Sequence, residues 1–103
     1  MIVVISTLRL WNGESASWHF IDVPAEKAAD VRAHSLASRG GFGSVRVEAT
    51  IADSSSGSGQ AVIWRTSVFP QKSGGYLLPV KKEVRRSAGI AAGDEVTVEL
   101  ELL

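Results

Sequence analysis

The fold of this chain is decided at residues 76–102, which run YLLPVKKEVRRSAGIAAGDEVTVELEL. A short apolar strand, Tyr76–Leu78, closes at Pro79 and leads into a helical segment, about Lys81–Ala88. Proline limits further sheet pairing because it has no backbone N–H to donate. Gly89 suits the left-handed position after a helix, which a residue without a Cβ adopts at little cost. The stretch therefore predicts a strand–proline–helix–glycine unit.

The strand that follows this unit carries the clearest alternation in the sequence. It begins after a turn at Gly93-Asp94. Its expected inward side chains are Val96, Val98, Leu100 and Leu102, and its expected outward ones are Glu95, Thr97, Glu99 and Glu101. Because successive side chains of a strand point to opposite faces, this pattern predicts one buried and one solvated face.

The start of the chain predicts two strands joined by a tight turn. Ile2–Leu10 is predicted as a strand buried on both faces. Asn12-Gly13 is a strong hairpin signal, and it joins this strand to a second one, Ser17–Val23.

A first helix is expected after these strands, and it repeats the plan of the later unit. Pro24 is predicted as its first residue, and Gly40-Gly41 ends it. The stripe expected to pack against the sheet consists of Ala25, Ala29, Ala33 and Leu36. Two strand–proline–helix–glycine–strand units in one chain suggest a weak internal duplication.

Two more strands are expected between the helices. Ser44–Asp53 alternates, and the residues expected on its inward face are Val45, Val47, Ala49 and Ile51. Ser54–Gly59 is predicted as a polar hairpin tip, and Gln60–Phe69 as the return strand. With two short helices and six or seven mostly hairpin-linked strands, the chain is predicted as mainly β, a small β-barrel in a single domain over residues 1–103. Closure of a barrel leaves few exposed strand edges.

The composition disfavours several kinds of site. Eleven Lys and Arg balance eleven Asp and Glu, so a broadly positive surface for polyanions is not expected. The absence of cysteine excludes disulfides and thiolate chemistry, and with only His19 and His34 neither a metal nor another cofactor is expected. The apolar start lacks the pattern of a secretory signal and is shorter than the ~20 residues of a membrane span, which favours a cytoplasmic protein.

Catalytic motifs are weakly represented. The Gly-x-Ser-x-Gly pattern of a nucleophile elbow is absent. Ser67 with His19 and an aspartate is a candidate nucleophile–base set, but a structural role for this serine is the favoured interpretation.

The second helix carries the strongest local charge. Its cations at i,i+4 spacing are Lys81, Lys82, Arg85 and Arg86. One hypothesis is that this basic face contacts nucleic acid or another anion. The favoured alternative is that acids of the last strand, Glu95, Glu99 or Glu101, neutralise it, because the net charge is zero and only Tyr76 is expected nearby for base stacking.

Aromatic residues of the predicted strands are Trp18, Phe20, Trp64 and Phe69. Core packing is expected for most of them, and above all for Phe20 and Phe69. Around Trp64 the alternation places Arg65 and Ser67 on the opposite face of the strand. A barrel mouth lined by these groups is a candidate small-molecule site, with Trp64, Arg65 and Ser67 as its residues.

Several strings in this chain together resemble one known family. They are Trp18–Pro24, Val45–Ile51, Trp64–Pro70, Gly75–Ile90 and Gly93–Leu100. On these strings, which cover essentially the whole chain, the sequence is similar to the domain of unknown function 1905 family. The resemblance implies a bacterial or archaeal small β-barrel of the double-split type, and it implies no activity because none is established for the family.

A second resemblance concerns the stretch from Leu78 to Val96. It is similar to the proline–helix–glycine hairpin of AbrB-type swapped-hairpin DNA-binding proteins, which dimerise to complete a barrel. In this chain the two units are expected to complete the barrel internally. DNA binding is not implied by the resemblance, because a shared fold does not carry function and the charge here is balanced.

These observations favour a non-catalytic, small-barrel binding or accessory module with an unknown ligand. One alternative is nucleic-acid binding through the basic helix, and the other is small-molecule binding near Trp64. Nucleic acid is disfavoured by the zero net charge, and a membrane partner is not expected. Both a monomer and a homodimer are compatible with the sequence.

Overall fold

The computed structural model describes residues 2–12, 17–37, 44–52, 61–72 and 74–103. Its elements in chain order are β1 (Ile2–Asn12), β2 (Ser17–Val23), α1 (Ala29–Ala37), β3 (Val45–Ala52), β4 (Ala61–Pro70), β5 (Tyr76–Pro79), α2 (Lys82–Ala88) and β6 (Glu95–Leu102). The predicted tips and helix end at Asn12-Gly13, Gly40-Gly41 and Ser54–Gly59 lie partly or wholly outside the described residues.

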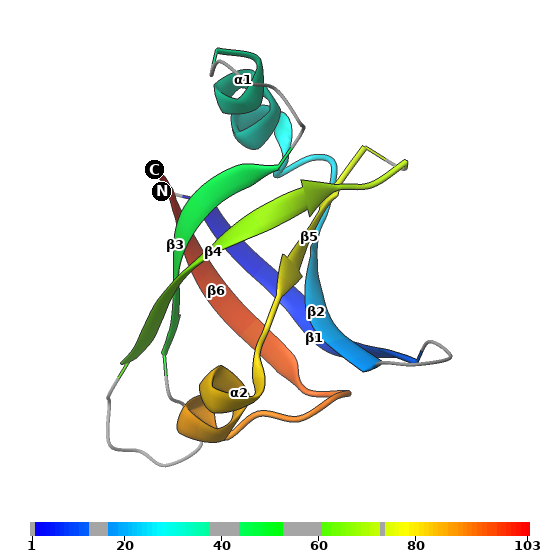
Figure 1. Ribbon diagram of the computed structural model, residues 1–103, viewed down its shortest axis with the longest axis vertical. Helices are drawn as coiled ribbons and strands as arrows, with labels where there is room; N and C mark the ends of the chain where they lie inside the picture. Colours follow the sequence, from blue (N-terminus) through cyan, green and yellow to red (C-terminus); the bar gives the residue numbers. More distant parts are fainter. Residues whose placement is uncertain (1, 13–16, 38–43, 53–60, 73) are drawn as a thin grey trace.

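The described strands close into an antiparallel barrel (Figure 1). Their hydrogen-bonded order is β1-β2-β5-β4-β3-β6, and β6 returns to β1. β1 serves two neighbours, because residues 2–7 pair with β6 and residues 8–12 with β2. β4 is divided in the same way between β3 and β5. The prediction of a mainly β chain with a small barrel and two short helices is confirmed.

The barrel consists of two copies of one topological unit. Exchanging β1 with β4, β2 with β5 and β3 with β6 leaves the strand order unchanged, and it exchanges α1 with α2. Each helix connects the second and third strands of its unit and follows a proline, Pro24 or Pro79. The units complete each other, since β2 pairs with β5 and β3 with β6. This topology agrees with the internal duplication that the sequence suggests.

Aliphatic side chains fill the interior of the barrel. The predicted inward residues of β3, which are Val45, Val47, Ala49 and Ile51, are all buried. In β6 the predicted alternation also holds, with Val96, Val98 and Leu100 buried and Leu102 half-buried. The outward residues of β6 are exposed. Alternation therefore identified the inner wall of these two strands.

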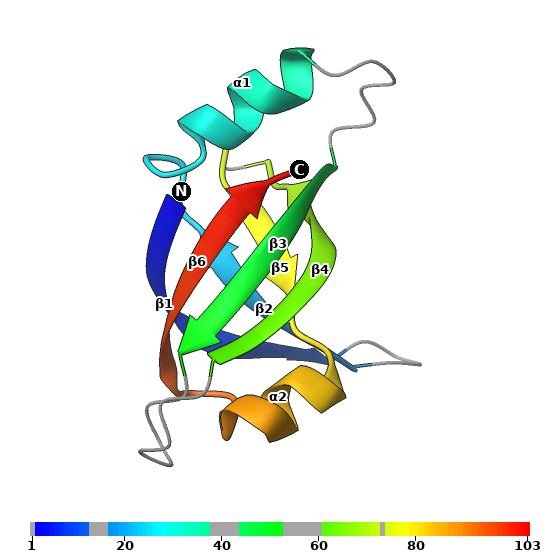
Figure 2. The same cartoon turned by 90° about the vertical axis from the view of Figure 1, so that its left-hand side faces the viewer.

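The helices cap opposite ends of the barrel (Figures 1 and 2). α2 ends as predicted, with Gly89 in the left-handed conformation at φ 67°. The Gly89 N–H donates to the carbonyl of Arg86 at 3.3 Å, and the Ile90 N–H donates to that of Arg85 at 3.0 Å. This pair of bonds is a Schellman motif, which satisfies carbonyls that the last turn of a helix leaves unpaired. Ile90 packs against the core, whose members include Val84.

The prediction that the first strand is buried on both faces is wrong. Ile2, Val4 and Leu8 are buried, whereas Val3 and Ile5 are exposed. The wall of a single-layered barrel has solvent on its outer side, so an apolar run there still alternates in burial. The strand also continues past Leu10 to Asn12, because its second half pairs with β2.

The start and the buried stripe of the first helix also differ from the prediction. Pro24 begins a turn, closed by the Lys27 N–H donating to the Pro24 carbonyl at 2.9 Å, and α1 begins only at Ala29. The predicted stripe is exposed at Ala25, Ala29 and Ala33, while the side chain of Leu36 is outside the described set. Instead Ala28 and Val31 are buried. Because the turn delays the start of α1 to Ala29, a different set of side chains faces the core from the set that a helix starting at Pro24 would present. Within the described residues, neither helix is long and apolar enough to cross a membrane.

Candidate functional site

An aromatic surface lies on the outside of the barrel, where β1, β2, β5 and β4 are neighbours. Trp11 lies directly opposite Trp18 in the ladder between β1 and β2. Phe69 lies opposite Leu77 in the ladder between β4 and β5. A pocket of about 450 Å³ is lined here by Trp11, Trp18, His19, Phe20, Phe69, Leu77 and Pro79, and we call it the aromatic pocket.

Strand alternation explains why these large side chains face solvent. Ile21 and Leu78 are register partners and both are fully buried, so their neighbours Phe20 and Pro79 point outward. The exposed fractions are 55% for Trp11, 59% for Trp18 and 47% for Phe69. The prediction of core packing is therefore wrong for Phe69 and Trp18, while Phe20 is half-buried in the pocket wall. β4 crosses from β3 to β5 at this point, and its inward position is taken by Val68.

A second hollow adjoins the aromatic pocket on the side of α2. We call this hollow, which has a volume of about 230 Å³, the basic pocket. It is lined by Ser17, Trp18, His19, Pro79, Val80, Lys81, Lys82 and Arg85. The two pockets share Trp18, His19 and Pro79. Among the described residues, no carboxylate belongs to either of these two linings. Three cationic side chains thus lie at one end of a mostly apolar surface.

His19 links the barrel wall to the basic helix. Arg85 Nη1 lies 3.2 Å from His19 Nε2, and because arginine has only donors, the imidazole nitrogen accepts this hydrogen bond. The carbonyl of His19 accepts from the Val80 N–H at 2.9 Å, which ties β2 to the residue before the helix. Burial lowers the pKa of His19 below its ordinary value, and the charge of Arg85 lowers it further. Both effects favour the neutral imidazole that this geometry requires.

Comparison with known proteins places the chain in a family. A family model described as "Domain of unknown function (DUF1905)" matches residues 5–100. The chain belongs to the DUF1905 family. The matched segment contains every residue that lines the aromatic and basic pockets. No curated protein matches the sequence.

In this DUF1905 domain, three of the four predicted helix cations meet at one place. Lys81, Lys82 and Arg85 line the basic pocket, whereas Arg86 is exposed outside that lining. Among the described residues, the ion pairs are Arg9–Asp22 at 2.7 Å and Arg65–Glu48 at 3.3 Å. Neither pair involves α2, so the proposed neutralisation by acids of the last strand is not observed in the described part of the chain.

The aromatic partner of these cations also differs from the expected one. Tyr76 is buried, with 4% of its surface exposed. Trp18 instead lies beside Lys81, Lys82 and Arg85 in the basic pocket. The DUF1905 barrel brings them together because β2 pairs with β5, which leads directly into α2.

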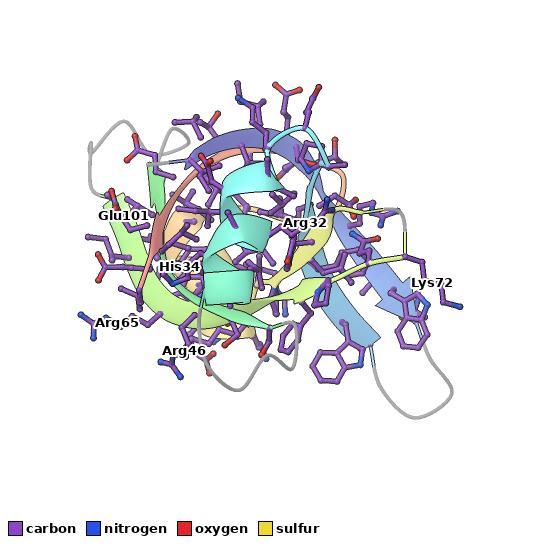
Figure 3. All side chains as sticks on the ribbon, turned by 90° about the horizontal axis from the view of Figure 1, so that it is seen from above. Arg32, His34, Arg46, Arg65, Lys72 and Glu101 are labelled. Atoms are coloured by element: carbon purple, nitrogen blue, oxygen red, sulfur yellow. The ribbon has the colours of Figure 1, made fainter. Side chains whose placement is uncertain are left out.

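The predicted site around Trp64 is divided between two faces of β4. Trp64 belongs to the buried core, and its indole N–H has no hydrogen-bond partner among the described residues. Arg65 points away from the barrel and pairs with Glu48 (Figure 3). Ser67 is half-buried opposite Arg46 on β3. None of the three predicted residues lines the aromatic or the basic pocket.

The groups considered for catalysis or metal binding are likewise separated. Ser67 is on β4 and His19 is on β2, with β5 between these strands. His34 is on α1, where its Nε2 lies 2.8 Å from the carbonyl of Leu103. No group of three or more His, Cys, Asp or Glu side chains that could hold a metal ion is found among the described residues.

Sequence reasoning missed the contributions of Trp11, Leu77 and Pro79 to the site. Their shared position on one outer surface depends on which strands are neighbours. One partial signal was available, since Trp11 and Trp18 lie on the two strands that the Asn12-Gly13 hairpin signal joins. That signal did not give the register, because a two-residue turn at Asn12-Gly13 would place Trp11 opposite residue 14, whereas Asn12 belongs to β1 and Trp11 pairs with Trp18.

Proposed function

We propose that this DUF1905 domain is a non-catalytic binding or accessory module, and that the aromatic pocket receives the apolar part of a small ligand. The observation that carries this proposal is the gathering of Trp11, Trp18, Phe20, Phe69, Leu77 and Pro79 around one hollow. These residues come from four strands, β1, β2, β4 and β5.

The size and chemistry of the pocket support a small ligand. Ligand sites commonly measure about 300–1,000 Å³ and are lined mainly by apolar and aromatic side chains, and the volume of about 450 Å³ lies in this range. Large side chains held half-exposed around a concavity leave apolar surface in water. A bound apolar group removes that surface from water, which is the favourable term in binding.

The test is fluorescence titration with N-phenylnaphthylamine, a neutral dye that emits strongly in apolar surroundings. Wild-type protein is expected to bind it in a saturable manner. Trp18→Ser and Phe69→Ser should each weaken binding about tenfold, because burial of an aromatic side chain contributes roughly 1.5–3 kcal/mol when complete.

The matched control is Ile63→Ser. Ile63 is 60% exposed on β4 and lies outside the lining of the aromatic pocket. Binding that is equally weakened by Ile63→Ser, or unaffected by both pocket variants, would contradict the proposal. Far-ultraviolet circular dichroism of each variant confirms that the barrel is folded.

A second candidate function is nucleic-acid binding through Lys81, Lys82, Arg85 and Arg86. It is supported by the exposed Trp18 beside three of these cations, because basic side chains next to an aromatic platform suit single-stranded nucleic acid. The zero net charge opposes it. Fluorescence anisotropy with a labelled oligonucleotide at low salt tests it, and affinity that falls steeply with added salt is the expected result.

Three finer features also belong to this proposal. The absence of cysteine is consistent with a reducing compartment, and we place the module in the bacterial or archaeal cytoplasm. The exchange of strands between two proline–helix units supports a relationship to AbrB-type barrels. Either a monomer or a homodimer is compatible with a barrel that closes within one chain.

A further inference from the structure

We propose that the ligand is a small amphipathic organic anion. Its apolar part occupies the aromatic pocket, and its carboxylate or phosphate group lies at Lys81, Lys82 and Arg85. This inference rests on the proposed function, because it names the class of molecule that the same pocket takes.

The first argument is that the two pockets adjoin each other. Trp18, His19 and Pro79 belong to both linings, so the two hollows are neighbours on one surface. A molecule seated against Trp18 therefore has apolar surroundings at one end and cations at the other. Such a site favours a ligand with the same division between its two ends.

The second argument is that the charge of Arg85 is held in place without being neutralised by any described residue. Its partner is the neutral imidazole of His19, which accepts a hydrogen bond and carries no negative charge. Its Nε is buried and has no hydrogen-bond partner among the described residues. Lys81 and Lys82 are exposed beside it, and no described residue of the pocket lining is acidic. An anionic group would provide the missing countercharge.

Arg9, near Phe20 of the aromatic pocket, shows the opposite arrangement. Its guanidinium lies 4.8 Å from the centre of the Phe20 ring. It also pairs with Asp22 at 2.7 Å, so its charge is compensated within the protein. The α2 side of the site is therefore the favoured place for a ligand's negative group. The apolar part of the ligand then points away from α2, into the aromatic pocket.

The third argument separates a small anion from a polyanion. A polymer such as single-stranded nucleic acid gains affinity from many phosphate contacts along a positive surface. This chain has zero net charge, and the cations of the lining are gathered within one hollow of about 230 Å³. Three charges in one place suit a single carboxylate or phosphate, which arginine and lysine bind by charge-assisted hydrogen bonds.

The experiment compares two dyes that differ by one anionic group. Anilinonaphthalene sulfonate has the apolar rings of N-phenylnaphthylamine and carries a sulfonate in addition. The folded protein is expected to bind the sulfonate dye more tightly, by about fivefold or more, since each exposed charge contact contributes roughly 0.2–1 kcal/mol. Added salt should remove this preference and leave binding of the neutral dye unchanged.

Charge variants then locate the anionic group. Lys81→Gln/Lys82→Gln is expected to remove the preference for the sulfonate dye while binding of the neutral dye persists. The control is Lys27→Gln/Lys72→Gln, which removes the same charge at the two other lysines of the chain. Lys27 follows Pro24 and Lys72 precedes Gly74, at the α1 end of the barrel, and this variant should keep the preference.

The outcomes distinguish this inference from the proposed function. Equal affinity for both dyes, or a preference that survives Lys81→Gln/Lys82→Gln, overturns the anion inference and leaves the apolar pocket standing. Failure of the neutral dye to bind contradicts the proposed function itself. Displacement of the sulfonate dye by a single-stranded oligonucleotide at a lower concentration than by decanoate or dodecyl phosphate assigns the site to a polymer and also overturns the inference.

Discussion

The two ends of the barrel are built from the same unit and differ in charge. Two residues after its proline, the first unit has Glu26 and the second has Lys81. Six residues after it, the first has Asp30 and the second has Arg85. The hollow at the α1 end is lined by Ile2, Val3, Glu26, Lys27, Ala29 and Asp30, whereas the charged residues described in the lining at the α2 end are all cations.

Each helix has one arginine that donates a hydrogen bond to the other unit. The accepting residues are at equivalent positions of the two units, but the accepting groups differ. Arg32 of α1 donates to the carbonyl of Gly74 at 2.6 Å, and Arg85 of α2 donates to the imidazole of His19. Gly74 and His19 each lie five residues before the proline of their unit. The first contact fastens a turn to a helix, and the second holds a cation beside a pocket. Because both lie outside the shared core, the ends differ while the barrel stays closed.

The largest expected effect concerns the core that both ends share. Leu100 of β6 is fully buried, so Leu100→Ala should lower the free energy of unfolding by about 2–5 kcal/mol through lost burial and the resulting cavity. Urea denaturation followed by tryptophan fluorescence measures this change. The exposed neighbour Glu99 provides the control, and Glu99→Ala should change stability by less than about 0.5 kcal/mol. Similar values for the two variants would contradict the assigned core.

The next largest effect is expected from a change at the C-terminal end of α2, which should affect this helix more than α1. Gly89 has a φ of 67°, and alanine in the left-handed region costs about 1–2 kcal/mol, so Gly89→Ala should lower the melting temperature. Hydrogen exchange should accelerate in α2 more than in α1, because Gly89 and its Schellman motif end α2. Ser87→Ala, on the exposed side of the same helix, is the control. Unchanged exchange in α2 would count against this ending.

Exchanging charge between the two units tests the functional difference directly. Lys81→Glu places in the second unit the acidic residue that the first unit has at the equivalent position, Glu26. This change should weaken binding of anilinonaphthalene sulfonate about tenfold, which corresponds to about 1.4 kcal/mol. The reciprocal change, Glu26→Lys, should create no dye site, since no described residue that lines the hollow at the α1 end is aromatic. Dye binding gained by Glu26→Lys would show that charge alone defines the site.

The smallest expected effect is a pH dependence that arises from His19 at the α2 end. The pKa of His19 is below its ordinary value of 6.5 in the folded chain, so the unfolded chain takes up this proton first. The free energy of unfolding should therefore fall as pH drops from about 7 through 6.5 towards the lowered pKa, and level off below it. His19→Gln should reduce this slope in urea denaturation at stepped pH. An unchanged slope would contradict the assigned pKa direction.

Elements with a strong local pattern were predictable from sequence. β3 and β6 alternate without interruption, and α2 lies between a proline and a left-handed glycine. α1 was predictable only as a helix. Its residues are mostly small or polar, so the stripe predicted from helical spacing was a weak signal, and the turn after Pro24 decides that Ala28 and Val31 face the core.

The candidate site also has one part that was predictable from the sequence and one part that was not. Lys81, Lys82 and Arg85 could be singled out because they are close in sequence. Their aromatic neighbours come from β1, β2, β4 and β5, and apolar residues occur on both faces of β4, as Ile63 and Val68 illustrate. Sequence alternation therefore could not show that Phe69 faces outward or that Trp64 faces inward.

The sequence by itself determined the class of fold, the repeated unit and the basic character of the second helix, because these depend on contacts between residues near each other in the chain. The tertiary structure decided that β2 lies against β5 and that Trp18 consequently lies beside Lys81. Long-range pairing depends on how the whole set of strands closes around one core. The position of an apolar pocket next to the cations Lys81, Lys82 and Arg85 is a consequence of that closure.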